Sequence, residues 1–214
     1  MNKVIENILS LMCFLPACLG IFKYKRIEKK LHPFIFMMIL DFLIEFTFNS
    51  VLKFSVTRYF NQLIVNLYML LNFSIFLYLV FINGFISKKL MLIFISISVP
   101  IAVFNAIYNG TILTTFFYLL SFVSTVMLFI SIDILSKQIL VINKRMTDNC
   151  WFWISSFSIL YNGFTLLIFG LYFFSLFNTP DGRTTFIIHH FVNATCYVFF
   201  AIGIFKIPEK ISTL

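Results

Sequence analysis

The sequence predicts an all-α, polytopic membrane protein with seven transmembrane helices, its N-terminus outside the cytoplasm and its C-terminus inside. Three observations lead to this prediction. The chain is 61% hydrophobic and only 11% charged, whereas soluble domains are roughly 25% charged. Its apolar residues form seven long runs, each able to cross the roughly 30 Å hydrocarbon core of a bilayer as a helix. Its Lys and Arg residues are concentrated in alternate loops, as they are in the cytoplasmic loops of membrane proteins.

Short polar or turn-forming segments separate the seven runs, so each run is expected to form one helix. The basic segment KYKRIEKK follows the first run, which favours a membrane helix over a cleaved signal peptide. Pro33 suits the first turn of the second helix, and Pro100 predicts a kink in the fourth. Asn109-Gly110 and the segment NTPDGR at 178–183 predict turns. The expected helices cover residues 4–22, 33–52, 60–85, 90–108, 113–135, 151–177 and 184–205.

The basic residues are distributed unevenly between the two sides of the expected bundle. Of the 16 Lys and Arg residues, 12 lie after the first, third, fifth and seventh runs, and 4 lie on the opposite side. This bias sets the predicted orientation. It also accounts for the net charge of +8 without any nucleic-acid partner. The connections are short, so residues 1–214 are expected to form a single domain in the lipid bilayer.

The second run carries a polar stripe inside an otherwise apolar segment. Asp41, Glu45 and Asn49 are spaced i, i+4, i+8, which places them on one face of a helix. A carboxylate at mid-membrane costs several kcal/mol or more unless it is paired, neutralised or hydrated. The stripe is therefore expected to face the bundle interior, where other helices supply its partners.

Other helices offer polar side chains that can meet this stripe. We predict a ligand-binding site in the bundle interior that opens toward the outside. The alternative is that the same groups form interhelical hydrogen bonds that hold the bundle together. With the stripe, the candidate ligand-binding residues are Asp41, Glu45, Asn49, Asn66, Tyr68, Asn72, Asn162, His189 and Asn193.

The sequence argues against several known chemistries of seven-helix proteins. Retinal needs a lysine in the last helix, and the first lysine there is Lys206 at its exit. A zinc site of three histidines is not expected, because His32 belongs to the opposite end from His189 and His190. The four cysteines are scattered and show no metal-binding spacing. We therefore expect no cofactor, no metal and no catalytic residue.

Several stretches resemble a family of small, uncharacterised seven-helix membrane proteins common in Bacteroidota. The resemblance rests on Glu45, on NLYMLLNF at 66–73, on FWISSFSILYNG at 152–163 and on IIHHFVNATCYVFFAIGIFK at 187–206. In that family the position of Asn72 is usually an acid, so the amide here departs from the pattern. The resemblance implies a bacterial inner membrane protein, a sensory or accessory role beside a partner such as a sensor kinase, and no enzyme activity.

The predicted function is therefore that of a non-enzymatic, receptor-like or accessory membrane protein whose buried polar site binds a small ligand or a partner protein. Two alternatives stay open at this point. One is an intramembrane lipid-processing enzyme that uses Asp41, Glu45 and His189 as acid–base or metal-binding groups. The other is a structural subunit of a membrane complex.

Overall fold

A computed structural model describes residues 11–50, 58–107, 112–141, 146–173 and 180–208. Within these residues the chain is helical and contains no strand, with seven α-helices and three short 3-10 turns. Three of the helices are long and apolar enough to cross a membrane, over Ile64–Ile82, Tyr118–Leu140 and Cys150–Ile168. Phe14–Lys23 and His190–Phe205 are shorter apolar stretches. The prediction of an all-helical membrane protein is confirmed to this extent.

The helices follow the predicted runs closely, with two corrections. The helix α6 continues to Val141, past the expected end at residue 135, and the helix α8 begins at Pro180. Residues 180–183, expected as a turn, therefore form the first turn of a helix. The missing N–H of Pro180 costs nothing there, because the first N–H groups of a helix have no partner within the helix. Asn109-Gly110 lies outside the described residues. The bounds are α2 Phe14–Lys23, α3 His32–Ser50, α4 Arg58–Ile82, α5 Lys88–Ile107, α6 Ile112–Val141, α7 Cys150–Phe173 and α8 Pro180–Phe205.

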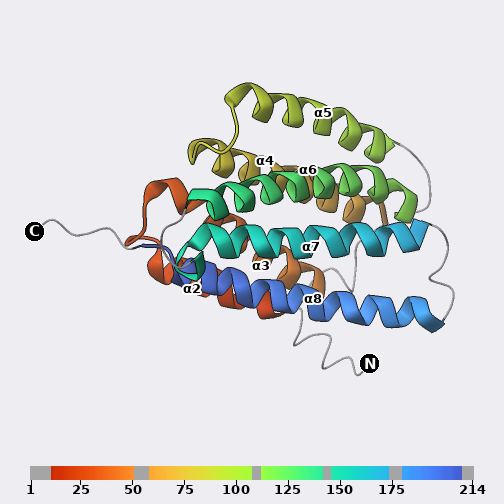
Figure 1. Cartoon of the computed structure of the whole chain (residues 1–214). Helices are drawn as coiled ribbons and strands as arrows, with labels where there is room; N and C mark the ends of the chain where they lie inside the picture. The colour runs from red at the N-terminus through yellow and green to blue at the C-terminus, as the bar shows by residue number, and fades with distance from the viewer. Residues whose placement is uncertain (1–10, 51–57, 108–111, 142–145, 174–179, 209–214) are drawn as a thin grey trace, which may run out of the picture.

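Six of the helices form a closed cycle of packed neighbours. The order around the cycle is α2, α3, α4, α6, α7 and α8, and α8 returns to pack against α2. The helix α5 packs against α4 and α6 from outside the cycle and lies at the edge of the bundle (Figure 1). Much of its surface is exposed and apolar, including Leu92, Ile93, Val103 and Phe104. Such a surface suits contact with lipid.

Aromatic rings pack across the inside of the bundle, and a small residue allows close packing of two neighbouring helices. Phe34 of α3 packs edge-on against Phe200 of α8, with ring centroids 5.7 Å apart. Between α2 and α3, Gly20 packs directly against the side chain of Ile35. A Cβ atom at Gly20 would lie 2.7 Å from the Cγ2 atom of Ile35. Glycine is therefore required there by packing, as small residues are in close helix pairs within membranes.

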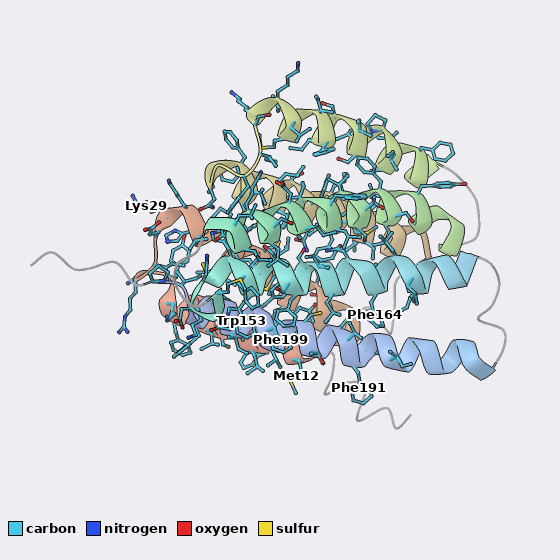
Figure 2. All side chains as sticks on the ribbon, in the orientation of Figure 1. Met12, Lys29, Trp153, Phe164, Phe191 and Phe199 are labelled. Carbon is cyan, nitrogen blue, oxygen red and sulfur yellow. The ribbon has the colours of Figure 1, made fainter. Side chains whose placement is uncertain are left out.

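Stacked rings join α7 to α8 on another side of the bundle (Figure 2). The Trp153 ring lies nearly parallel to the Phe199 ring, with 5.6 Å between their centroids. Phe157 stacks on Phe199 at 3.5 Å between centroids. The indole N–H of Trp153 donates to the carbonyl of Thr147 at 2.8 Å. The polar edge of the tryptophan is thus satisfied while its ring packs against apolar neighbours.

The helix ends that carry most of the described Lys and Arg residues meet at one end of the bundle, here called the basic end. It consists of the C-terminal ends of α2, α4, α6 and α8 and the N-terminal ends of α3, α5 and α7 (Figure 1). The Lys23 ammonium donates to the carbonyl of Phe205 at 2.8 Å. Lys206 pairs with Asp148, also at 2.8 Å. Figure 2 shows Lys29 at this same end.

A glycine turn between α4 and α5 organises the basic end. Gly84 has a φ of 79°, and the N–H of Phe85 donates to the carbonyl of Val80 at 3.0 Å. This is the hydrogen-bond pattern that ends many helices with a left-handed glycine. Ser87 then caps α5, because its hydroxyl accepts the N–H of Leu90 at 3.2 Å.

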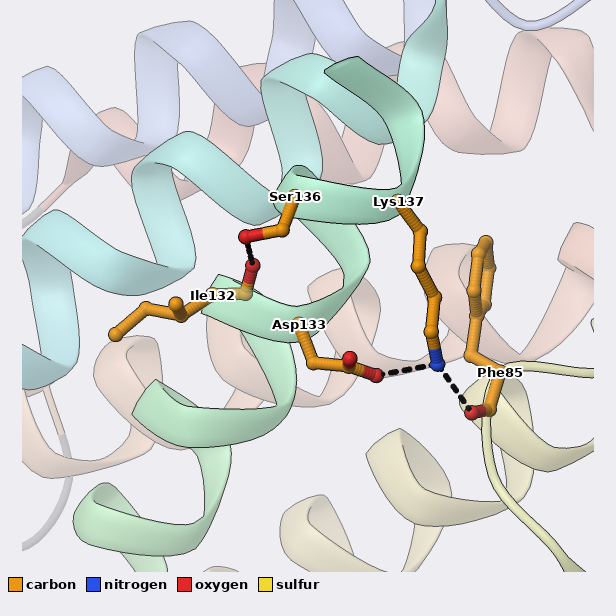
Figure 3. A network of polar contacts seen from close by, with 5 residues as sticks. All are labelled: Phe85, Ile132, Asp133, Ser136 and Lys137. Carbon is orange, nitrogen blue, oxygen red and sulfur yellow. Dashed lines mark hydrogen bonds and ion pairs between the residues drawn. The ribbon is translucent and has the colours of Figure 1, made fainter. Parts of the chain in front are cut away.

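The same turn is joined to α6 by a polar contact (Figure 3). The Lys137 ammonium lies 2.6 Å from a carboxylate oxygen of Asp133 and 3.5 Å from the carbonyl of Phe85. Both charged side chains are about half exposed, so this ion pair contributes at most about 1 kcal/mol. Through the contact with Phe85, the same ammonium links the α4–α5 turn to α6.

Candidate functional site

Asp41 of α3 is the buried acid around which the candidate site is built. Only 6% of its surface is exposed. The Tyr68 hydroxyl of α4 donates to its Oδ1 atom at 2.6 Å. The Asn72 amide nitrogen donates to the same oxygen at 2.7 Å and to the Tyr68 oxygen at 3.1 Å. We call Asp41, Tyr68 and Asn72 the polar triad.

The sequence spacing explains why these side chains meet. Tyr68 and Asn72 are four residues apart, so they lie one above the other on the face of α4 that packs against α3. Asp41 lies on α3 within reach of both. The three groups therefore join two neighbouring helices through hydrogen bonds to a carboxylate, which are stronger than bonds between neutral groups.

The triad has used its hydrogen-bond donors but still has an acceptor available. Tyr68 has one O–H, which donates to Asp41, and both Asn72 amide hydrogens are accounted for by Asp41 and Tyr68. The Asn72 Oδ1 atom is buried and has no hydrogen-bond partner among the described atoms. A buried polar atom left in this state costs roughly 1–3 kcal/mol.

Asn66 is buried on a different face of α4. It lies two residues before Tyr68, which is about 200° around a helix. Only 2% of its surface is exposed, and within the described part of the chain neither atom of its amide has a hydrogen-bond partner. The structure therefore does not bring Asn66 into hydrogen bonding with the triad, although both were predicted for one site.

Asn162 belongs to a second polar group, between α6 and α7. The Ser131 hydroxyl donates to the Ser158 hydroxyl at 2.8 Å. The Asn162 amide nitrogen donates to the Ser158 carbonyl at 2.8 Å and lies 3.2 Å from its hydroxyl. These residues form a seam of neutral hydrogen bonds between two helices, as expected for groups that hold a membrane bundle together. Ser131 was not among the predicted residues, and a single serine in an apolar run gives little sequence signal.

The remaining predicted residues lie on α3 and α8. The side chains of Glu45, Asn49 and His189 fall outside those that the structure describes. Asn193 is half-buried on α8. Tyr161 of α7, which was not predicted, lies close enough to Tyr68 for the two to interact electrostatically.

Within the described residues, no group of three or more His, Cys, Asp or Glu side chains is placed to hold a metal ion. Comparison with family models, with curated proteins and with solved structures finds no match. The chemistry of the polar triad is therefore the basis for a functional proposal.

Proposed function

We propose that the protein is a receptor-like or accessory module of the bacterial inner membrane that binds a small ligand, or a polar group of a partner protein, at the polar triad. It would be non-enzymatic and would span the membrane seven times. The observation that carries the proposal is the buried Asp41 carboxylate, held by two donors, beside the unpartnered oxygen of Asn72.

The depth of the triad supports this proposal. Asp41 lies nine residues from the start of α3 at His32, and Asn72 lies ten residues from the end of α4 at Ile82. At about 1.5 Å of rise per residue, both are roughly 14–15 Å from the basic end. This distance is about half of the roughly 30 Å hydrocarbon core. The triad would thus lie near the middle of the bilayer, where an ionisable side chain usually indicates function.

A comparison with the Ser131–Ser158–Asn162 seam favours binding over a purely structural role. That seam joins α6 to α7 without a formal charge. A neutral pair could join α3 to α4 in the same way, without the cost of burying a carboxylate. The charged triad is therefore an expensive means of joining helices, and this cost is explained if it also recognises a ligand.

The proposed orientation places the basic end in the cytoplasm and the N-terminus outside. Exposed Lys25, Arg26 and Lys29 at this end would face the anionic inner leaflet, which attracts Lys and Arg by about 1 kcal/mol each. A membrane partner such as a sensor kinase could contact the same end and receive the signal. The family resemblance motivates this choice of partner.

The proposal is tested by the access of water to position 72 in intact membranes. Asn72→Cys and Ser158→Cys are made in a chain whose four native cysteines are replaced by alanine. Each is then treated with small methanethiosulfonate reagents, which react with water-exposed thiolates. A binding site requires Asn72→Cys to react much faster than Ser158→Cys, the matched control in a neutral seam. Equal, negligible rates would identify the triad as a dry contact between helices and overturn the proposal.

A further inference from the structure

We propose that the outer face of α5 is the contact surface between two copies of this chain, which pair side by side in the membrane about a two-fold axis. The contact would centre on Ser96 and Pro100. This inference goes beyond the proposed function. It uses the proposed seven-span arrangement but does not depend on the polar triad.

The outer face of α5, at the edge of the bundle (Figure 1), has a polar centre. Ser98 is buried, whereas Ser96 and Pro100, each about 200° from it around the helix, are exposed. Ile93 and Val103 are also exposed and extend the same line. Residues 93, 96, 100 and 103 are thus spaced three, four and three apart. This spacing is typical of the line along which two helices pack.

Pro100 leaves one carbonyl on this face without its usual donor. In an α-helix the carbonyl of residue 96 accepts the N–H of residue 100, and the proline inside α5 has no N–H. The hydroxyl of Ser96 belongs to the same residue, which is exposed. The centre of the face therefore presents a hydrogen-bond acceptor and a donor together.

The depth of Ser96 makes these polar groups unfavourable in contact with lipid. Ser96 lies eight residues from the start of α5 at Lys88, or about 12 Å from the basic end. In the proposed arrangement this depth lies inside the roughly 30 Å hydrocarbon core. Lipid chains offer no hydrogen bond to a carbonyl there. The helices that pack against α5, α4 and α6, leave this face uncovered.

A second copy of the chain is the occupant that fits this face. A two-fold axis along the membrane normal brings the same residues of two copies together. The Ser96 hydroxyl of each copy can then donate to the Ser96 carbonyl of the other, whereas an unrelated helix would need its own matching donor. The small serine lets the two helices come close. Exposed Lys89 continues the line at the basic end, where anionic lipid headgroups can separate the two ammonium groups.

Disulfide cross-linking in membranes tests the position of the contact. Ser96→Cys is made in a chain whose four native cysteines are replaced by alanine, and the full chain is placed in vesicles of phosphatidylethanolamine and phosphatidylglycerol. Oxidation with copper phenanthroline should give a disulfide-linked dimer whose yield persists as the protein is diluted with lipid. Leu71→Cys, on the exposed face of α4, is the matched control and should form little dimer.

Energy transfer between labelled chains tests the hydrogen bonds. Lys25→Cys, exposed at the basic end, carries a donor or an acceptor dye in the same background. Ser96→Ala removes both interhelical hydrogen bonds and should raise the dimer dissociation constant roughly eight-fold or more. Pro100→Ala restores the N–H that the Ser96 carbonyl lacks and should also weaken the dimer. Ser98→Ala is the control, because that hydroxyl bonds within α5, to the Ile95 carbonyl at 2.8 Å, and it should leave the dissociation constant unchanged.

Three results would overturn the inference. The first is a cross-linking yield for Ser96→Cys that is no higher than that for Leu71→Cys. The second is a dissociation constant that neither Ser96→Ala nor Pro100→Ala changes. The third is a product in native membranes that joins Ser96→Cys to a different protein in place of the dimer. A dimer that forms while Asn72→Cys is inert would leave this inference standing and the binding function rejected.

Discussion

Replacing Gly20 by alanine tests the tight packing of α2 on α3. The added Cβ atom would lie 2.7 Å from Ile35 Cγ2 and 3.4 Å from both Ile35 Cβ and Ile35 Cγ1. Ile35 is fully buried and β-branched, so its χ1 angle is nearly fixed within a helix. The side chain cannot move aside, and the two helices must separate. Overpacking of this kind costs about 1–3 kcal/mol.

A matched control corrects the comparison for the intrinsic preference of alanine for helices. Alanine is favoured over glycine in a helix by about 1 kcal/mol, and this gain applies to both Gly20→Ala and Gly163→Ala. At Gly163 of α7 the added Cβ atom would meet nothing within 4 Å. The difference between the two variants therefore isolates the overpacking, and it corresponds to roughly 2–12 °C in unfolding temperature.

The assay is thermal unfolding of the two variants in nanodiscs of uncharged lipid. We expect Gly20→Ala to unfold at a lower temperature than Gly163→Ala. In the background of Ile35→Ala, which removes the clashing Cγ2 atom, Gly20→Ala should lose most of its cost, as coupled neighbours do in a double-mutant cycle. If Gly20→Ala is as stable as Gly163→Ala, the close approach of α2 to α3 is wrong.

Two further substitutions test other parts of the structure by the same assay. Gly84→Ala should cost about 1–2 kcal/mol, because a side chain disfavours the left-handed conformation at a φ of 79°. No steric cost is expected to add to it, since a Cβ atom there meets nothing within 4 Å, and an unchanged stability would contradict the glycine turn. Tyr68→Phe should lower stability by about 1.5–3 kcal/mol, since it removes a hydrogen bond to the Asp41 carboxylate, and an unchanged stability would contradict that hydrogen bond.

The helices could be predicted from sequence because the length of an apolar run nearly determines the length of a membrane helix. The corrections lie at helix ends, where Pro180 can either end a loop or begin a helix. The grouping of basic loops at one end also followed from the sequence, and contacts such as that of Lys23 with Phe205 agree with it. The cycle of six helices and the outer place of α5 could not be predicted, because short loops do not specify distant neighbours.

The sequence predicted several residues of the candidate site, but it did not predict which of them lie next to one another. Asp41, Tyr68 and Asn72 stood out as polar residues in apolar runs, and the structure brings these three together. Whether Asn66 or Asn72 of α4 would meet Asp41 depends on the rotation of α4 about its axis. The sequence does not specify that rotation, so Asn66 and Asn162 were assigned to the same site although their surroundings differ.

The most direct test of the central claim is the reactivity of Asn72→Cys toward a small thiol reagent in intact membranes, measured beside Ser158→Cys. A ligand-binding site at the polar triad predicts rapid reaction at position 72 and almost none at position 158. Equal and slow reaction at both positions would contradict it and leave the triad as a structural contact between α3 and α4.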